Sequence, residues 1–350
     1  MMAQREGRDG KDVAMPHSLF RKRLEPMLML AGLLGMLWLG GRIGWPAIRA
    51  NIGLIGGWFF LLVVLYLFAQ MAFMAGWWVL LGTRARRMGY WRMFGIYLAG
   101  DSINYLVPPA NLTGEPVKAH LLGRSVGFSR SLMSITVHKH AEIVAQVLFL
   151  CGGLSITLVQ FALPTGLWFV ALGVVVGMGI FVVAIFWVLR RQAYGALLRG
   201  LVRIGLKKEL IEPHRDATAS LDRWLSLFYR TRMPVFYLAT FWCLLGWCGG
   251  LLETYLVLQL LSAKAGLGTA AAVEALAMAL NSMIFFIPGR VGSAETVRVV
   301  AFSALGLQAA QGASYGIIRR GRELVWTLPG LLVLLKMRVG IGGASREVTG

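Results

Sequence analysis

Acidic residues and cysteines are scarce in this 350-residue chain, and each scarcity excludes a class of protein. Only 15% of residues are charged, with 16 Asp and Glu against 35 Lys and Arg, whereas 57% are hydrophobic. A soluble domain cannot bury that much apolar surface, so we expect a multi-pass membrane protein. Cys151, Cys243 and Cys248 all lie in apolar segments without metal-ligand spacing, which is typical of small core residues.

Sequence motifs of enzyme chemistry are also missing. The chain has no nucleophile elbow, no P-loop and no set of spaced metal ligands, so we predict no enzyme activity, no cofactor and no metal. A net charge of +19 is compatible with nucleic-acid binding. However, the cations fall in loops between apolar runs, which is the pattern that membrane insertion leaves. We therefore expect membrane lipids, and no nucleic acid, as partners.

The apolar runs predict one membrane domain over residues 24–338. A basic cytoplasmic tail (1–23) precedes this domain and a second cytoplasmic tail (339–350) follows it. Crossing about 30 Å of hydrocarbon takes roughly 20 helical residues. We predict six full spans by this criterion, at about 24–41, 52–82, 129–161, 167–189, 234–261 and 311–336.

A cytoplasmic loop at residues 190–233 carries ten of the cations. Within it, Leu221, Trp224, Leu225 and Phe228 recur at i, i+3, i+4 and i+7. This spacing predicts an amphipathic helix lying on the membrane surface.

The placement of the cations predicts the orientation. With the N-terminus in the cytoplasm, cytoplasmic segments hold 26 of the 35 Lys and Arg, and outer loops hold three. Positive residues concentrate on the cytoplasmic side of membrane proteins. We therefore predict a bacterial inner-membrane protein with both termini in the cytoplasm.

One stretch occurs twice, 180 residues apart. DSINYLVPPANLTGEPVK (101–118) and NSMIFFIPGRVGSAETVR (281–298) align without a gap. Each is an apolar run that ends at a proline, crosses small residues, and restarts with a carboxylate three residues before a cation. This pattern predicts a re-entrant helical hairpin in each of two repeats, at about 52–163 and 234–337. The predicted hinge residues are Pro108, Pro109, Gly114, Pro288, Gly289 and Gly292.

The predicted topology relates the two repeats by inversion. The span before the first hairpin runs inward and the span before the second runs outward, and this holds even if the hairpins cross fully and the count of crossings becomes ten. The predicted fold is therefore an all-α polytopic inner-membrane helical bundle with inverted repeats, each containing a re-entrant hairpin. Inverted repeats with broken helices are typical of secondary transporters.

The second arm of each hairpin predicts a site for an anionic headgroup. Gly114 and Ser293 open these arms, and Lys118 and Arg298 follow one turn later. Helix N-termini offer free N–H groups and a positive dipole end to an anion. Alternatively, each cation simply neutralises the carboxylate three residues before it. The repetition favours function, because each ionisable residue in a membrane interior costs about 2.5–3.5 kcal/mol to insert.

Two further charged clusters lie in predicted spans. His138 and Glu142 share a helix face, but no third ligand is spaced to complete a zinc site. With Lys139 they form either a proton relay or headgroup contact, or a plain buried ion pair. Near the outer start of the last span, three arginines need anionic partners, for which Glu323, Glu253 and a lipid phosphate are candidates. The full predicted headgroup path is Asp101, Asn104, Glu115, Lys118, His138, Lys139, Glu142, Asn281, Glu295, Arg298, Arg319, Arg322 and Glu323.

Two stretches of the chain carry a resemblance to a known family. NYLVPPANLTGEPVKAHLL and IPGRVGSAETVRVVAFSALGL resemble the twin signatures of the membrane domain of lysylphosphatidylglycerol synthases and related flippase-like proteins. Those signatures read roughly N-x-x-x-P…G-G-E-x-x-R-x-x-L and P-G-G-x-G-x-x-E. Thr113, Lys118 and Arg290 replace a glycine, an arginine and a glycine of the pattern. The resemblance covers about residues 25–338, and among relatives it is greatest to members associated with hopanoid biosynthesis.

The resemblance implies translocation of lipids between leaflets. The soluble domain with which the full synthases make an aminoacyl lipid has no counterpart in the 14 residues after the last predicted span, so synthase activity is not implied. We predict a flippase or transport protein for an anionic or amphiphilic lipid, for which a hopanoid-related lipid is one candidate. The alternative is a non-transporting scaffold that holds lipid-biosynthetic enzymes through residues 190–232. A membrane-embedded lipid-modifying enzyme is a weaker third candidate, since a catalytic set is missing.

Overall fold

The computed structural model describes residues 41–42, 44–106, 114–161, 165–190, 215–261, 265–283 and 292–344. Throughout these ranges the regular elements are helices, which confirms the all-α membrane bundle. Several predictions fall outside the described residues. These are the first span except Gly41, the N-terminal tail, residues 345–350 of the C-terminal tail, most of the basic loop, and the hinge residues Pro108, Pro109, Pro288 and Gly289. Residues 339–344, which we predicted to be part of the C-terminal tail, are helical.

The predicted span at 52–82 is divided in the structure. Helix α2 (Trp45–Ile55) and helix α3 (Phe59–Leu81) are joined by a 3-10 turn at Gly56–Trp58. Gly56 has φ of 40°, a conformation in which a side chain would be strained, so this glycine allows the change of direction. The whole stretch from Trp45 to Leu81 is still long and apolar enough to cross a membrane.

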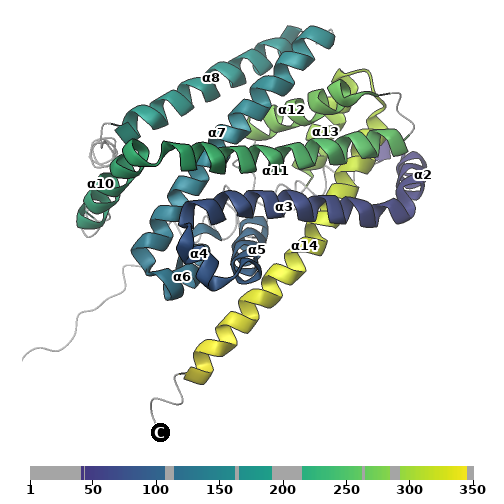
Figure 1. Ribbon diagram of the computed structural model, residues 1–350. Coiled ribbons are helices and arrows are strands. Elements are labelled where there is room, and N and C mark those ends of the chain that lie inside the picture. The colour runs from purple at the N-terminus through teal and green to yellow at the C-terminus, as the bar shows by residue number, and fades with distance from the viewer. Residues whose placement is uncertain are drawn as a thin grey trace, which may run out of the picture.

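The rest of the first repeat forms the arms of the predicted hairpin and a long helix. The short helix α4 (Thr83–Met88) leads to α5 (Tyr90–Leu106), the first arm of the hairpin. The second arm is α6 (Gly114–Val126), and α7 (Phe128–Gln160) follows it. Figure 1 shows α4, α5 and α6 together near the end of α3.

Two helices connect the repeats, α8 (Thr165–Arg190) and α10 (Arg215–Thr231). The structure confirms a helix at the predicted amphipathic segment, but it places the apolar face against protein. Leu225 and Phe228 are buried in a cluster with residues of α7 and of the helix that follows α10. The prediction that the apolar face of this helix contacts the membrane surface is therefore wrong for these two side chains, because packing within the bundle already covers them.

The second repeat consists of α11 (Met233–Leu260), α12 (Leu267–Met283), α13 (Ser293–Ala304) and α14 (Ala309–Ala344). Helices α13 and α14 begin within one residue of the positions that a 180-residue shift of α6 and α7 predicts. The repeated sequence therefore produces the same succession of helices twice.

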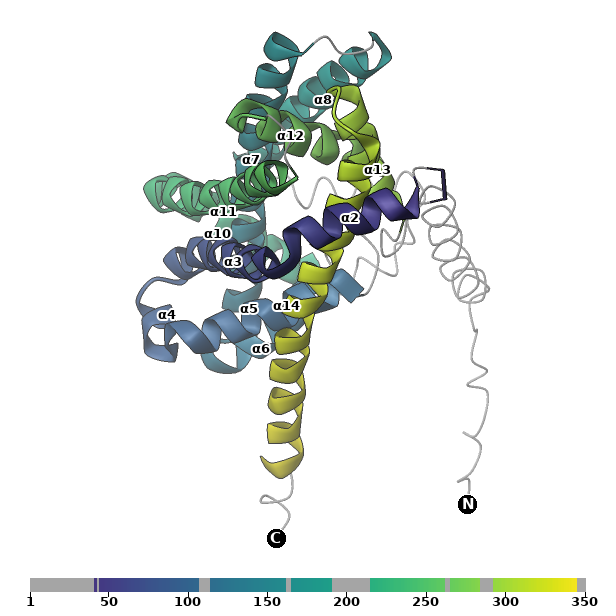
Figure 2. The ribbon, with the colours of Figure 1, turned by 90° about the vertical axis from the view of Figure 1, so that its right-hand side faces the viewer.

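In each repeat, the long last helix packs on the first hairpin arm of the other repeat. Helix α7 packs on α12 of the other repeat, and α14 packs on α5. Within each repeat the second arm packs on the long helix that follows it, α6 on α7 and α13 on α14. Helices α3 and α11 lie side by side and run in opposite directions (Figure 1). In both views α12 and α13 lie on one side of this pair, and α5 and α6 lie on the other (Figure 2).

Small residues allow these helices to approach closely. A Cβ added to Gly153 of α7 would lie 2.6 Å from the Cβ of Ala275 in α12. Likewise, a Cβ on Gly76 of α3 would lie 2.9 Å from the carbonyl oxygen of Ala239 in α11. Membrane helices associate through such small-residue contacts, because lipid gives no hydrophobic drive between helices.

Three stretches of the described residues are long and apolar enough to cross a membrane: Trp45–Leu81, Phe128–Gln160 and Met233–Leu260. Shorter apolar helices occur at Trp168–Ala184 and Leu267–Ser282. Helix α14 has 36 residues, but it is not among the three. It carries Arg319, Arg320, Arg322 and Glu323 close together. These charged side chains need polar partners inside the bundle.

Candidate functional site

A cavity of about 620 Å³ lies among the two hairpins and the long helices α3, α7, α11 and α14. Eleven of the thirteen predicted path residues line it, and they come from both repeats: Asp101, Asn104, Lys118, Lys139, Glu142, Asn281, Glu295, Arg298, Arg319, Arg322 and Glu323. The structure therefore brings together residues more than 200 positions apart in the chain.

The two remaining residues of the predicted path lie outside the lining. Glu115 lies beside the cavity, with its Oε1 3.2 Å from Lys118 Nζ. His138 is 4% exposed, and its Nε2 lies 2.9 Å from the carbonyl oxygen of Phe73 in α3. Packing between α3 and α7 thus places His138 away from the headgroup path that we predicted for it.

The first backbone N–H of α6 has a hydrogen-bond partner within the same hairpin. The Gly114 N–H donates to Asn104 Oδ1 at 2.6 Å, and Asn104 Nδ2 donates to Glu115 Oε1 at 3.4 Å. A Cβ on Gly114 would overlap the carbonyl oxygen of Gly100, so this predicted hinge glycine also permits the arms to touch. Asn104 therefore accepts the hydrogen bond of the first backbone N–H of α6, in the manner of a helix cap.

Charges of the first repeat form a chain of ion pairs. Lys118 pairs with Glu115 as the i, i+3 alternative predicts, and its Nζ lies 4.7 Å from the centre of the Tyr97 ring. Lys139 Nζ donates to Glu142 Oε2 at 3.0 Å and lies 3.9 Å from Glu115 Oε1. Lys139 thereby links the second arm of the hairpin to helix α7.

Asp101 differs from the other carboxylates of this repeat. Gln70 Nε2 donates to its Oδ2 at 2.7 Å, and the Tyr97 hydroxyl donates to Gln70 Oε1 at 3.3 Å. Across the described part of the chain, the ion pairs include no partner for Asp101. Its carboxyl group is therefore held by a neutral amide within the cavity.

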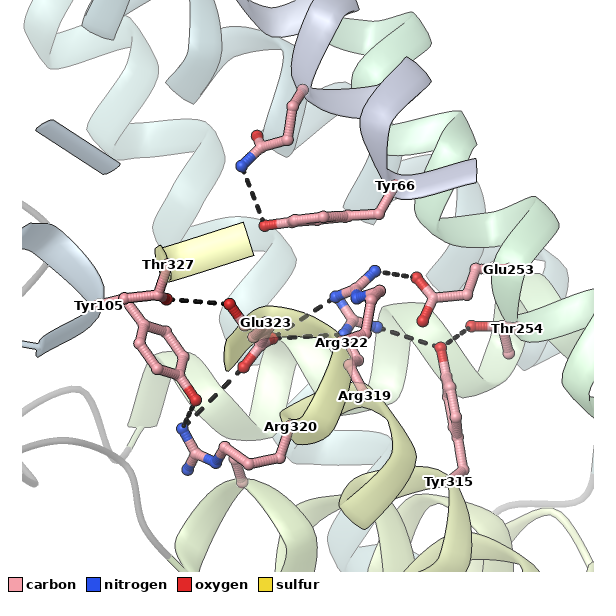
Figure 3. Close-up of polar contacts among 12 residues, drawn as sticks. Tyr66, Tyr105, Glu253, Thr254, Tyr315, Arg319, Arg320, Arg322, Glu323 and Thr327 are labelled. Carbon is pink, nitrogen blue, oxygen red and sulfur yellow. Dashed lines mark hydrogen bonds and ion pairs between the residues drawn. The ribbon is translucent and has the colours of Figure 1, made fainter. Parts of the chain in front are cut away.

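The three arginines of α14 pair with carboxylates on three other helices. Figure 3 shows the pair of Arg322 with Glu253 and the position of Glu323 among the arginines. Arg319 Nη1 donates to Glu274 Oε1 of α12 at 2.7 Å, and Arg320 Nε donates to Glu295 Oε1 of α13 at 3.1 Å. Arg322 donates to Glu253 of α11, which confirms Glu253 as a partner. Glu323, the other predicted partner, lies 3.6–3.9 Å from all three guanidinium groups.

Aromatic side chains that no sequence pattern indicated complete this cluster. Tyr66 of α3 lies with its ring 3.7 Å from the guanidinium carbon of Arg322, a close cation–π contact. Tyr105 of α5 accepts a hydrogen bond from Arg320 Nη1 at 2.9 Å, which joins the two repeats. Tyrosines in apolar helices carry no charge, so only the position of Tyr66 or Tyr105 opposite an arginine reveals its role.

The second repeat does not form the i, i+3 pair that the first one forms. Glu295 is taken by Arg320, and Arg298 Nη1 donates instead to the carbonyl oxygen of Ala294 at 3.1 Å. The Arg298 guanidinium lies 5.4 Å from the centre of the Tyr315 ring, and its buried Nε has no hydrogen-bond partner. In addition, no described side chain caps the start of α13. The neutralisation alternative is therefore correct for the first hairpin and wrong for the second.

Comparison with known proteins places the chain in a family. Residues 27–330 match the family model described as the lysylphosphatidylglycerol synthase TM region. No curated protein and no solved structure matches the chain. Since the match covers most of the chain, this protein belongs to the family of lysylphosphatidylglycerol synthase transmembrane regions, a membrane-domain family related to lipid metabolism or transport.

Proposed function

We propose that this protein moves a lipid between membrane leaflets by passing the headgroup through the cavity between its two hairpins. The observation that carries the proposal is a single cavity of about 620 Å³, lined by charged residues of both repeats inside an apolar helical bundle. Ionisable residues within membrane segments are costly and mark substrate paths. Ligand sites commonly have volumes of about 300–1,000 Å³, which is enough for a lipid headgroup.

The arrangement of the repeats supports transport by alternating access. Helices α3 and α11 are antiparallel, and the two hairpins lie on opposite sides of this pair (Figures 1 and 2). We propose that the repeats are inverted and that each hairpin enters the bilayer from its own side. The cavity would then open to either leaflet as the repeats move relative to each other around a fixed site.

The basic helices support the proposed orientation. Figure 1 shows α4 and α10 at one end of the α3–α11 pair and α2 at the other. Helix α4 has the sequence TRARRM, and α10 carries Arg215, Arg223 and Arg230. The positive-inside pattern therefore favours a cytoplasmic location for the α4 and α10 end, in a bacterial inner membrane.

We propose that Arg320 closes the path between the hairpins. It bridges Tyr105 of the first hairpin and Glu295 of the second. A headgroup phosphate offers the same guanidinium a charge-assisted partner. Exchange of Glu295 for the phosphate would separate the hairpins as the headgroup passes. This step is ligand exchange, and we propose no catalytic chemistry for the chain.

Proteoliposomes with fluorescently labelled lipids test the proposal. We expect wild-type protein to translocate labelled lipid, and Glu295→Gln to slow it because Arg320 loses its charged partner. Glu115→Gln should slow it because Lys118 loses its carboxylate partner and Lys139 keeps only Glu142. Val159→Ala is the matched control, because Val159 is 87% exposed and lies away from the cavity. Unchanged translocation by both glutamine variants of an active protein would contradict the proposal.

The labelled lipids should include anionic, amphiphilic and hopanoid-derived molecules, because the hopanoid association stays a prediction. Folded, correctly inserted protein that translocates none of them would favour the scaffold alternative. In that case lipid-biosynthetic enzymes should co-purify with the chain, and deletion of residues 190–214 should release them. That deletion leaves the buried apolar face of α10 in place.

A further inference from the structure

We infer that the cavity selects a zwitterionic headgroup, with a phosphate bound at Arg298 and an ammonium bound at Asp101. This inference rests on the proposed function and names the substrate class of the same site. It depends on an acidic and a basic side chain that line the same cavity and that have no ionic partner among the described residues.

Arg298 is the cation that lacks a carboxylate. It lines the cavity and is 7% exposed, and its Nε is buried without a hydrogen-bond partner. Two acids of the same lining are engaged elsewhere, since Glu274 accepts from Arg319 and Glu295 accepts from Arg320. A guanidinium in this state is costly to bury unless a ligand pairs with it. Phosphate oxygens match its planar donors.

Asp101 is the carboxylate that lacks a cation. It lines the same cavity, and Gln70 donates a hydrogen bond to one of its oxygens. Lys118 is the cation of the same hairpin, but it pairs with Glu115 at 3.2 Å. An ammonium group from a ligand would supply the missing positive charge, with N–H donors for the carboxylate.

Every other charged residue of the lining is already paired within the described part of the chain. The pairs are Lys118 with Glu115, Lys139 with Glu142, Arg319 with Glu274, Arg320 with Glu295, and Arg322 with Glu253, while Glu323 lies within 4 Å of three arginines. Asp101 and Arg298 therefore remain as one negative and one positive group for a ligand.

The repeats differ at these two positions, and the difference gives the cavity its polarity. The counterpart of Asp101 is the neutral Asn281, and the counterpart of Arg298 is the paired Lys118. The first repeat thus supplies a negative subsite and the second a positive one. A purely anionic headgroup would be repelled by Asp101, and a purely cationic one by Arg298, so the site discriminates against both.

Binding of short-chain lipids to the purified full-length protein tests the inference without requiring transport. The probes are dihexanoyl-phosphatidylethanolamine and its N-acetylated derivative, which keeps the phosphate but loses the ammonium charge. We expect wild-type protein to bind the first about tenfold more tightly or better, as one charge-assisted hydrogen bond provides. This comparison needs no variant. Equal affinities would overturn the inference.

Two substitutions assign the ends of the ligand. Asp101→Asn keeps the side-chain shape and should remove the preference for the ammonium form without weakening the N-acetylated lipid. Arg298→Gln should weaken both lipids about tenfold, and Arg298→Lys should restore most of that loss. Val159→Ala should change neither. A loss of both lipids in Asp101→Asn, or of neither in Arg298→Gln, would contradict the assignment.

The same preparations separate this inference from the proposed function. If the ammonium preference depends on Asp101 but reconstituted protein moves no lipid, the binding site stands and the transport proposal fails. If the protein moves both lipids at equal rates and binds them equally, transport stands and the zwitterionic site fails.

Discussion

Replacing Arg322 with glutamine should destabilise the protein more than replacing its partner Glu253 with glutamine. Both residues are 1% exposed, and they pair across α14 and α11. Removing one member of a buried ion pair typically costs about 3–5 kcal/mol, because the other charge stays buried without compensation. The two residues differ in what remains beside them after the substitution.

After Glu253→Gln, Arg322 keeps two favourable contacts. Glu323 Oε1 lies 3.6 Å from Arg322 Nη2, and the Tyr66 ring lies 3.7 Å from the guanidinium carbon. After Arg322→Gln, Glu253 has no other cation within 4 Å in the described part of the chain. We therefore expect Arg322→Gln to reach the upper part of that range and Glu253→Gln to fall near or below its lower end.

Thermal unfolding in detergent, followed by tryptophan fluorescence, measures this ranking. For a chain of this size a loss of about 3–5 kcal/mol should lower the midpoint by about 5–15 °C. The double variant, with glutamine at both positions, should be more stable than Arg322→Gln alone because no charge is left unpaired. Additive losses in the double variant, or a larger loss for Glu253→Gln, would refute the reasoning.

Two further predictions use matched neighbours on one helix. Gly153→Ala should destabilise the contact with Ala275 by about 1–3 kcal/mol, because the added Cβ would lie 2.6 Å from that side chain. Gly152→Ala meets nothing within 4 Å and should be neutral or slightly stabilising, so an equal loss in both variants would show that packing is not the cause. In α10, Leu225→Ala should lower the free energy of unfolding by about 2–5 kcal/mol, whereas Leu227→Ala should change it by about 0.5 kcal/mol or less. Leu225 is 1% exposed and Leu227 is 59% exposed, and the reverse order in a denaturation experiment would place the opposite face of α10 against the bundle.

Local sequence signals were sufficient to predict the class of the protein and the positions of most helices. Apolar runs, glycines and prolines act within a few residues of the chain, so they mark where helices begin and end without reference to distant elements. The repeated stretch correctly predicted helices α5 and α6 and their counterparts α12 and α13. Charges within apolar runs likewise identified eleven residues that line the cavity, because a buried charge is rare enough to stand out.

Only the tertiary structure decided which charged side chains form ion pairs and which have no ionic partner among the described residues. Glu115–Lys118 and Glu295–Arg298 have the same spacing, yet only the first forms an ion pair. Helix α14 carries Arg320 to Glu295 and leaves Arg298 with the carbonyl oxygen of Ala294. Ion pairing across helices depends on how elements far apart in the chain cross, and no local pattern records that crossing. For the same physical reason the sequence could identify the apolar stripe of α10 but not the helices that bury it.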